Sequence, residues 1–335
     1  MKTPSVSIII PTLNSERTLE KCLKSVRDQN YPKSNFEILL IDGGSIDSTE
    51  ILANKYNCRF IKGGYKEDQE ARKGVGLAES KNEIVGYIDS DNVLPNKHYL
   101  KEMIAPFNDI PDLVGTETWR YGIDNNFNIY NRYFALMGVN DVVAYYLGKA
   151  DKIPWSENTW KKGRVLSDNE KYVVVEFNEK NLPTVGANGF FAKREVLLKS
   201  KCKPNEFFHI DVVYDLLGQG FTKFAMVKNE INHDTASTIF KLAARRKKYF
   251  ANYGTISTRR YILFDIKSKS DVFLLLRFVF YTVTFVQPLF LSIRGFIKRR
   301  DIAWFLHVVV CWVFLWAYFS AVCSWLMVKF ASKKA

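Results

Sequence analysis

Short apolar runs alternate with longer amphipathic stretches from Val6 to Asp91. Four runs have the length and the β-branched content of buried strands: VSIII, FEILLID, CRFIKGG and EIVGYID. Three stretches between them repeat apolar residues at helical spacing: SERTLEKCLKSVRDQ, IDSTEILANKY and DQEARKGVGLAES. Strands that alternate with helices predict an α/β fold with a mostly parallel sheet and crossover helices. We expect Pro11 to end the first strand and Ser15 to cap the first helix.

Polar or glycine-rich loops follow three of these strands. The loops run from Pro11 to Asn14, from Asp42 to Ser45 and from Asp89 to Asn92. In parallel sheets, ligands bind beyond the carboxyl ends of the strands. We therefore expect the three loops to line one ligand site.

The pattern is less regular over residues 115–185. The apolar stretch FNIYNRYFALMGVNDVVAYYLG predicts a helix that could cover a cleft, and KYVVVEF predicts a strand. TVGANGFFAKREVL predicts a glycine-rich turn, a short strand and a helix. FHIDVVYDLLGQGF predicts a helix that ends at Gly220, and TKFAMVKNEINHD predicts a last strand that ends in His233 and Asp234.

The C-terminal part is far more apolar. Ile302 to Val328 contains no Asp, Glu, Lys or Arg and is long enough to cross a hydrocarbon core of about 30 Å, although a buried core helix is the alternative. Val272 to Ile293 holds Arg277, Gln287 and Pro288, so it either spans a membrane or lies at its surface as a bent helix. Two spans would put the basic loop RGFIKRRD outside, and one span with an interfacial helix would keep it inside.

Charge and composition narrow the functional classes. The 335 residues are 47% hydrophobic, which excludes a disordered chain and leaves room for one large domain or two ordinary ones. The net charge is +13, and much of it lies beside the apolar C-terminal stretches, as on the cytoplasmic side of a membrane. No nucleic-acid recognition motif accompanies the charge, so no nucleic-acid partner is expected. Five scattered cysteines fit a reducing compartment, and the N-terminal apolar run is too short for a signal peptide.

Asp89 and Asp91 are the first candidates for chemistry. Two carboxylates in a D-x-D loop can face one divalent ion, Mg²⁺ or Mn²⁺, whose remaining ligands come from substrate phosphates. A turn of solvated acids is one alternative. Another is the D-x-D-x-[TV] motif of haloacid-dehalogenase-type phosphatases, in which the first Asp attacks phosphate, but that motif belongs on the first strand. Asp42 could accept a hydrogen bond from a base or a ribose, or it could belong to a plain turn.

Four segments occur together in a specific order and spacing: VSIIIPTLN, IDGGSIDST, EARKGVGLAES and IVGYIDSDN. In this they resemble family 2 glycosyltransferases, which have the GT-A fold. VGANGFFAKREVL and the helix that ends at Gly220 extend the resemblance to about residue 235. The family uses a nucleotide sugar and a divalent metal, and it inverts the anomeric centre. The resemblance implies a catalytic domain over 1–235, and the charge and apolar pattern beyond it predict a basic juxtamembrane segment over 236–271 and a membrane region with one or two helices over 272–335.

The resemblance also implies roles for individual residues. The implied donor-binding residues are Pro11, Thr12, Asn14, Asp42, Arg72, Asp89, Gly186, Asn188 and Gly189. Asp42 would hold the base or the ribose, and Arg72 would approach the diphosphate, although a lone arginine on a helix is often a surface charge. Asp89 would face the ribose or a metal-bound water, and Asp91 would coordinate the metal. His233 would lie near the diphosphate and the metal, or it would be purely structural.

One position departs from the family pattern. The family usually carries a Glu-Asp pair at the start of the helix before Gly-Phe, and the Asp is the general base. Counting back from Gly220, this chain has Phe208 and His209 at that place. Asp211 and Asp215 follow on the same helix and are the candidate catalytic residues, with Asp211 preferred and a plain helix N-terminal acid as its alternative.

The expected function is an inverting, metal-dependent glycosyltransferase that is integral to the cell membrane, with its catalytic domain in the cytoplasm. The donor is a nucleotide sugar, with UDP favoured over GDP, and the acceptor is linked to a lipid. If the chain has no general base, the acceptor is expected to be a polyprenyl phosphate, because a phosphate oxygen needs no deprotonation. Membrane lipids are further expected partners. The alternatives of another class are a non-catalytic nucleotide-binding membrane module and an aspartyl phosphatase.

Overall fold

The computed structural model describes residues 3–124, 126–200, 202–235, 238–253, 259–265 and 267–331. Packing divides the chain into two compact units: unit 1 is Met1–Gly122 with Thr159–Asp234, and unit 2 is Ile123–Asn158 with Thr235–Ala335. The sequence predicts one domain over residues 1–235. In the structure, residues 123–158 are grouped with the C-terminal helices, because their apolar side chains pack there, and the predicted functional boundary at residue 235 stays a prediction.

Unit 1 contains a large sheet and the helices that cross over it. Its strands are β1 (Val6–Thr12), β2 (Phe36–Asp42), β3 (Arg59–Lys62), β4 (Ile84–Tyr87), β5 (Asn92–Val93), β6 (Gly115–Tyr121), β7 (Arg164–Asp168), β8 (Tyr172–Glu176), β9 (Phe190–Lys193) and β10 (Lys223–His233). Its helices are α1 (Glu16–Arg27), α2 (Thr49–Lys55), α3 (Gln69–Glu79), α4 (Tyr99–Asp109), α7 (Arg194–Leu197) and α8 (His209–Gly218), with 3₁₀ turns at Lys33–Asn35 and Pro204–Glu206.

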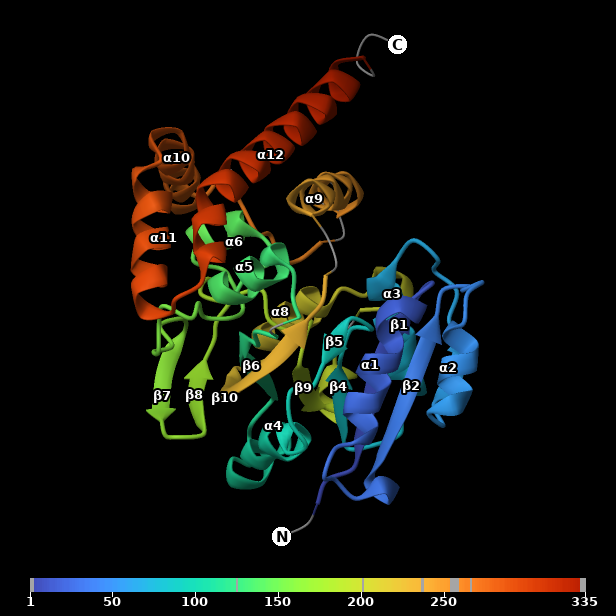
Figure 1. Ribbon diagram of the computed structural model, residues 1–335. Coiled ribbons are helices and arrows are strands. Elements are labelled where there is room, and N and C mark those ends of the chain that lie inside the picture. Colours follow the sequence, from blue (N-terminus) through green and yellow to red (C-terminus); the bar gives the residue numbers. More distant parts are fainter. Residues whose placement is uncertain are drawn as a thin grey trace. The chain divides into compact units, whose positions relative to one another are not determined.

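The sheet runs in the order β3-β2-β1-β4-β9-β6-β10-β8-β7, and β5 pairs with the end of β10 (Figure 1). β1 pairs in parallel with β2 and β4, and β2 pairs in parallel with β3. β9 runs antiparallel between β4 and β6, and β8 and β7 extend the sheet antiparallel beyond β10. All of β1 is buried, so the parallel half forms the centre of the core. The predicted α/β class is confirmed.

Two local predictions need correction: the end predicted for the first strand is wrong, and Ser15 is the N-cap residue of α1 as predicted but without a side-chain capping bond. β1 does not end at Pro11 but continues to Thr12, and Pro11 pairs with Ile41 of β2. Proline has no N–H to donate. β4 pairs with β1 only as far as Ile9, so at Pro11 no β4 residue needs that donor, and the strand can continue. Ser15 precedes α1, but its hydroxyl makes no capping bond and instead accepts from the N–H of Leu13 at 3.3 Å.

A glycine brings α3 close to the central strand. A Cβ placed on Gly76 would lie 2.4 Å from Cγ2 of Ile9, so only glycine permits this approach. At the other end of α3, the carboxylate of Asp68 accepts from the N–H groups of Glu70 and Ala71 at 3.0 Å. The cap and the close packing together fix where the first turn of α3 stands relative to β1.

Unit 2 is helical. It consists of α5 (Ile129–Met137), α6 (Val142–Tyr146), α9 (Ile239–Tyr253), α10 (Lys269–Thr284), α11 (Val286–Lys298), a 3₁₀ turn at Ile302–Phe305, and α12 (Leu306–Ala331). The single helix predicted before Gly148 is two helices in the structure. Gly138 ends α5 in the left-handed region with φ of 65°, and the side chain of Asp141 caps α6 by accepting from the N–H of Val143.

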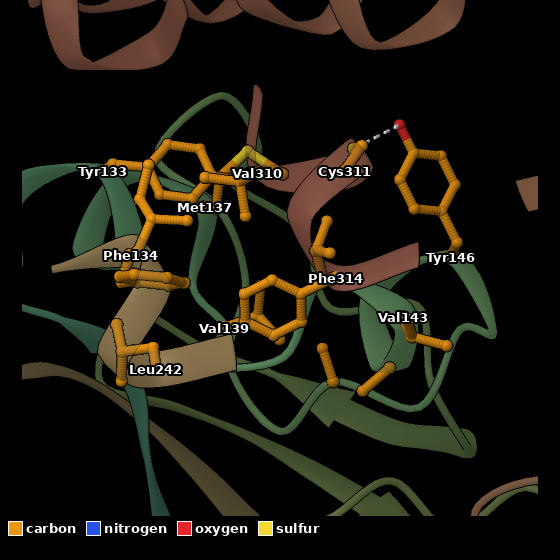
Figure 2. Packing of buried hydrophobic residues seen from close by; sticks show 14 of the residues in the cluster. Tyr133, Phe134, Met137, Val139, Val143, Tyr146, Leu242, Val310, Cys311 and Phe314 are labelled. Atoms are coloured by element: carbon orange, nitrogen blue, oxygen red, sulfur yellow. Dashed lines mark hydrogen bonds between the residues drawn. The ribbon is translucent and has the colours of Figure 1, made fainter. Parts of the chain in front are cut away.

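The core of unit 2 joins segments that are far apart in the sequence. Tyr133 and Phe134 of α5, Val143 of α6, and Val310 and Phe314 of α12 all lie in one apolar cluster (Figure 2). The buried His307 lies within the same unit, and its Nδ1 and Nε2 form hydrogen bonds with the hydroxyls of Tyr133 and Tyr146 at 2.7 and 3.0 Å. Both ring nitrogens of His307 are thus satisfied by tyrosines, which is a structural arrangement rather than a ligand site.

One segment is long and apolar enough to cross a membrane. Among the described residues this is Ile302–Ser324, with a mean hydropathy of 2.0 and 39% of its most apolar stretch buried in the protein. α10 and α11 pass the same test only as a pair, and they are bent by 80° at Phe285, whose φ is 61°. Phe280 and Phe290 are exposed on this bent pair. The stretch is bent, as the surface alternative expects, but a bent pair also fits a broken span, so the choice between a span and a surface helix stays a prediction.

Candidate functional site

The three predicted loops at the carboxyl edge of the parallel strands lie together in unit 1. The N–H of Asn14 donates to the hydroxyl of Ser45 at 2.8 Å, and the side chain of Asn14 accepts from the N–H of Ile46 at 3.0 Å. The hydroxyls of Ser15 and Ser90 are 3.1 Å apart and join the first loop to the third. Asn14 has φ of 48°, a conformation that asparagine tolerates better than most residues.

Asp42 organises the second loop. It is 3% exposed, and its carboxylate accepts from the hydroxyl of Thr12 at 3.1 Å and from the N–H groups of Gly44 and Ser45 at 2.8 Å. Burial raises the pKa of Asp42, but these hydrogen bonds outweigh it and hold the pKa below the ordinary value. An ionised Asp42 therefore fixes the loop that follows β2, beside the buried Pro11 and Thr12 of β1.

Arg72 is buried against this loop. It is 4% exposed, and its Nη1 donates to the carbonyls of Tyr65 and Lys66 at 2.7 and 3.1 Å. A Cβ placed on Gly43 would lie 2.7 Å from the same Nη1, so Gly43 makes room for the guanidinium. The alternative of a solvated surface arginine is therefore wrong. Arg72 holds a positive charge next to the Asp42 to Ser45 loop.

Asp89 forms an ion pair inside unit 1. Its Oδ1 lies 3.2 Å from Nζ of Lys73, and the same Nζ lies 3.3 Å from Oε1 of Glu70. The Lys73 side chain is 1% exposed. Burial lowers the pKa of Lys73, but the two carboxylates outweigh it and raise the pKa well above the ordinary value. Lys73 therefore stays charged and ties the D-x-D loop to α3.

Asp91 faces a different partner. Its Oδ1 lies 3.4 Å from Nε2 of His233, and the two side chains are 25% and 12% exposed. Sheet pairing explains the approach, because Asn92 in β5 pairs with His233 in β10 and the N–H of Asp234 donates to the Asp91 carbonyl at 2.9 Å. A carboxylate oxygen and an imidazole nitrogen at this separation fit one divalent ion such as Mn²⁺. Within the described ranges, no three His, Cys, Asp or Glu side chains converge on one point.

The glycine-rich segment before β9 forms a fixed platform in unit 1. The N–H of Gly186 donates to the carboxylate of Glu117 at 3.0 Å, and the N–H of Gly189 donates to the Tyr87 carbonyl at 3.0 Å. Asn188 is 6% exposed, and its Nδ2 lies 3.5 Å from the hydroxyl of Tyr121. The ring of Tyr121 also packs on His233, with centroids 5.4 Å apart. The platform and His233 therefore meet at one tyrosine.

The start of α8 is joined to α3. The backbone N–H and Nδ1 of His209 lie 3.1 and 2.7 Å from Oε2 of Glu70. Burial raises the pKa of Glu70, but the charges of His209 and Lys73 and the hydrogen bonds from His209 hold it well below the ordinary value. Asp211 is 2% exposed, and Asp215 accepts from Nε2 of Gln219 at 3.4 Å.

A family model described as glycosyl transferase family 2 matches residues 7–175, which is about half of the chain. The chain belongs to glycosyl transferase family 2. The resemblance read from the four motifs is thereby confirmed, and the mixed α/β sheet of unit 1 agrees with the GT-A fold expected of family 2. The phosphatase alternative is wrong, because the D-x-D loop follows the fourth strand of a family 2 domain.

Named relatives of this family 2 chain match it over part of their length. It is similar to glycosyltransferase AglE of Haloferax volcanii, 31% identical over 118 residues that cover 33% of this chain and 38% of that protein. It is also similar to the GalNAc(5)-diNAcBac-PP-undecaprenol beta-1,3-glucosyltransferase of Campylobacter jejuni, 31% identical over 100 residues that cover 27% and 31%. A solved mannosyltransferase of Pyrobaculum calidifontis, in complex with GDP-Man and Mn²⁺, aligns with a TM-score of 0.49 and 12% identity over 94% of this chain and 88% of that chain.

Sequence reasoning missed two charged residues of this family 2 site. Glu70 and Lys73 lie in the segment EARKGVGLAES, from which only Arg72 was predicted to matter. Their spacing of three residues puts both on one face of α3 and is the signal that was available. Their partners Asp89 and His209 come from other parts of the chain, so the pattern along the sequence could not show that the four meet.

Proposed function

We propose that the protein transfers a sugar from a nucleotide-sugar donor to a lipid-linked acceptor at the cytoplasmic face of the cell membrane. The main support is the set of loops around Asp91. There the Asp91 carboxylate lies next to the His233 imidazole, and the same edge of the sheet holds the buried charge of Arg72. Membership of family 2 supports sugar transfer. The Campylobacter jejuni relative is named for a glycan on diphospho-undecaprenol, and this likeness supports a lipid-linked acceptor.

The donor is assigned to the carboxyl edge of the parallel strands. The nucleoside lies against Pro11, Thr12 and Asn14, and Asp42 accepts from its base or ribose while it holds the loop. UDP is the favoured nucleotide. Arg72 contributes positive charge near the diphosphate, and the Gly186 to Gly189 platform supports the transferred sugar. In this scheme Asp89 fixes the D-x-D loop through Lys73 and faces the ribose.

The leaving group dictates the electrostatics of the reaction. A nucleoside diphosphate gains negative charge as the sugar bond breaks, so fixed positive charge lowers the barrier. Asp91 and His233 would hold Mn²⁺ or Mg²⁺, which supplies a Lewis acid to the diphosphate when bound. The positive charge of Arg72 stabilises the diphosphate in the same way and does not require a metal. Inversion follows when the acceptor attacks the anomeric carbon from the side opposite to the diphosphate.

The acceptor decides whether a general base is needed. A sugar hydroxyl must lose its proton, whereas a polyprenyl phosphate oxygen is already an anion. The predicted candidates on α8 are Asp211 and Asp215. The 2% exposure of Asp211 argues against it as a base that meets an acceptor, whereas Asp215 is partly exposed and accepts from Nε2 of Gln219 at 3.4 Å.

Unit 2 supports anchoring in the membrane. Ile302–Ser324 is the proposed span, and Trp312 and Trp316 are exposed along it. The bent α10 and α11 carry exposed apolar side chains on both arms and are assigned to the membrane surface. Exposed Arg245 and Lys247 on α9 add positive charge toward anionic lipid head groups. One span and one interfacial pair keep the basic loop after α11 on the cytoplasmic side.

The first test of this function is nucleotide release. Purified full-length protein in detergent is incubated with UDP-, GDP- and CMP-sugars, with Mn²⁺ or Mg²⁺, and with or without polyprenyl acceptors. We expect metal-dependent release from one donor and a loss of at least 100-fold in Asp91→Asn. Asp112→Asn is the matched control, because Asp112 is an exposed acid that forms a surface ion pair with Lys223. Release from no donor contradicts the transferase and leaves a nucleotide-binding module.

A further inference from the structure

His209 stands where the family pattern expects the carboxylate base, at the first residue of α8. Its backbone N–H and its Nδ1 both lie within hydrogen-bond distance of a single oxygen, Oε2 of Glu70. This double contact fixes the start of α8 and the rotation of the imidazole at once. A histidine held by a carboxylate through Nδ1 is a recurrent arrangement for general bases, because it fixes the tautomer with Nε2 unprotonated.

The protonation of Glu70 sets the tautomer of His209. An ionised carboxylate can only accept hydrogen bonds, so Nδ1 must carry the proton in the contact with Oε2. Besides the charge of His209 itself, Lys73 at 3.3 Å and the backbone N–H of His209 at 3.1 Å favour the ionised form of Glu70, and neither depends on the charge of the imidazole. In the neutral ring the lone pair is therefore on Nε2, which is the atom that can take up a proton.

The Cδ2 side of the His209 ring lies against Gly186 of the platform. Cδ2 of His209, the carbon bonded to Nε2, lies 3.2 Å from the place of a Cβ on Gly186. The His209 side chain is 12% exposed, so it is largely desolvated but reachable. In the part of the chain that the structure describes, no side chain or backbone group bonds Nε2 of His209. A group resting on the Gly186 to Gly189 platform would meet this nitrogen.

Helix geometry separates His209 from the two acids. Successive residues of an α-helix are about 100° apart, so Asp211 lies about 200° and Asp215 about 240° around the axis from His209. The face of α8 that carries His209 toward Glu70 and Gly186 therefore turns both acids away. The burial of Asp211 agrees with this placement.

Resting on the proposed function, we propose that His209 is the general base of the transfer and that Glu70 is its positioning residue. Nε2 of His209 takes the proton of an acceptor hydroxyl while that oxygen bonds to the anomeric carbon. The bond from the anomeric carbon to the donor phosphate oxygen breaks, and its electron pair leaves with the nucleoside diphosphate. Glu70 stabilises the imidazolium that forms, and the proton then passes to water.

A chemical class of acceptor follows from this assignment. A base aimed at the platform serves a hydroxyl acceptor and is superfluous for a phosphate anion. The acceptor is therefore a sugar carried on a lipid diphosphate or phosphate, and the transfer extends a glycan that an earlier glycosyl- or phosphoglycosyltransferase has begun. The alternative is transfer to a polyprenyl phosphate that carries no sugar, and the test compares the two kinds of acceptor.

The test measures transfer by full-length protein to two kinds of probe, polyprenyl diphosphates that carry one sugar, and bare polyprenyl phosphate. We expect wild-type transfer to a sugar-bearing probe, and a loss of about 100-fold or more in kcat for His209→Gln with the donor KM within threefold. His98→Gln, a change at an exposed histidine, keeps wild-type rates. Transfer to polyprenyl phosphate alone, or an Asp211→Asn loss with an active His209→Gln, overturns the inference. A wild type that releases no nucleotide overturns the proposed function and this inference together.

Two further readouts separate a base from a structural histidine. Imidazole added to His209→Ala should restore transfer in proportion to its unprotonated fraction, because the vacated space lies beside Gly186. Glu70→Gln should lower kcat and disturb its pH profile, since Glu70, paired in turn with Lys73, is the acid that contacts the ring among the residues that the structure describes. ¹⁵N labelling of the four histidines should assign an Nδ1–H tautomer to the resonance that disappears in His209→Gln. An Nε2–H tautomer or the absence of rescue contradicts the assignment.

Discussion

Single residues in unit 1 join parts of the site that are distant in the sequence. Lys73 is the clearest case, since one ammonium group lies within 3.3 Å of carboxylates from α3 and from the D-x-D loop. Gly43 likewise lets two segments meet, because the absence of a side chain leaves room for the guanidinium of Arg72. Each residue acts through its neighbours rather than by direct contact with a ligand.

Removing the Lys73 charge tests this connection. Lys73→Met leaves Glu70 and Asp89 without their buried cation, and we expect a loss of about 3–5 kcal/mol in the free energy of unfolding near neutral pH. Denaturant unfolding of the purified protein measures it. Lys55→Met is the matched control, because Lys55 pairs with Glu20 at the exposed surface and should change stability little.

The same variant carries a pH signature with a defined sign. The pKa of Glu70 is lowered from 4.5 in the folded chain, so its stabilising contribution is present above about pH 4.5 and is lost as the pH falls toward the folded value. Lys73 is part of the cause of that lowering. The stability gap between wild type and Lys73→Met should therefore narrow as the pH falls below 4.5. A gap that is constant with pH would falsify the ion-pair account.

At the scale of elements, the position of α3 against β1 depends on close packing. Gly76→Ala should destabilise the protein by about 1–3 kcal/mol, because a Cβ there would lie 2.4 Å from a methyl carbon of Ile9. A glycine-to-alanine change inside a helix is otherwise stabilising by about 0.5–1 kcal/mol. Gly218→Ala near the end of α8 meets its nearest neighbour at 3.5 Å and should be neutral or stabilising. Equal melting shifts in the two variants would contradict this account.

The sequence predicted the elements whose pattern is local. β2 was predicted at its full extent, and the three loops after β1, β2 and β4 were predicted to meet, because parallel strands present their carboxyl ends at one edge. Pro11 misled the prediction of β1, since its effect depends on which neighbouring strand is present at that point. The break at Gly138 was missed because the apolar pattern runs through it without interruption.

The parts of the candidate site that lie in the loops and in the family motifs were predictable from the sequence. The resemblance assigned Asp91 to the metal and His233 to the neighbourhood of the diphosphate and the metal, and the structure brings these two side chains to 3.4 Å. Their metal role and the roles of Asp211 and Asp215 stay predictions. The link from Asp89 through Lys73 and Glu70 to His209 was not predictable, because it depends on the register of α3 against two other elements.

At the scale of the whole molecule, the proposed topology can be tested by labelling. If α10 and α11 lie at the cytoplasmic surface and Ile302–Ser324 is the span, position 300 is cytoplasmic. A membrane-impermeant maleimide should then add no label to Arg300→Cys in intact cells, and should label it after lysis. Labelling from outside would instead mean that α10 and α11 form a second span. The basic loop would then lie outside the cell, contrary to the positive-inside rule.

The order in which the helices of unit 2 appear along the chain has a consequence for synthesis on the ribosome. Arg132 of α5 pairs with Asp301, 169 residues later, and the apolar side chains of α5 and α6 pack against α12. At about 5–20 residues per second, the nascent α5 and α6 wait roughly 10 to 30 s for that partner to emerge. A chain that ends at residue 235 would lack α12. The apolar side chains of α5 and α6 would then stay exposed, and chaperones and quality-control proteases would bind them.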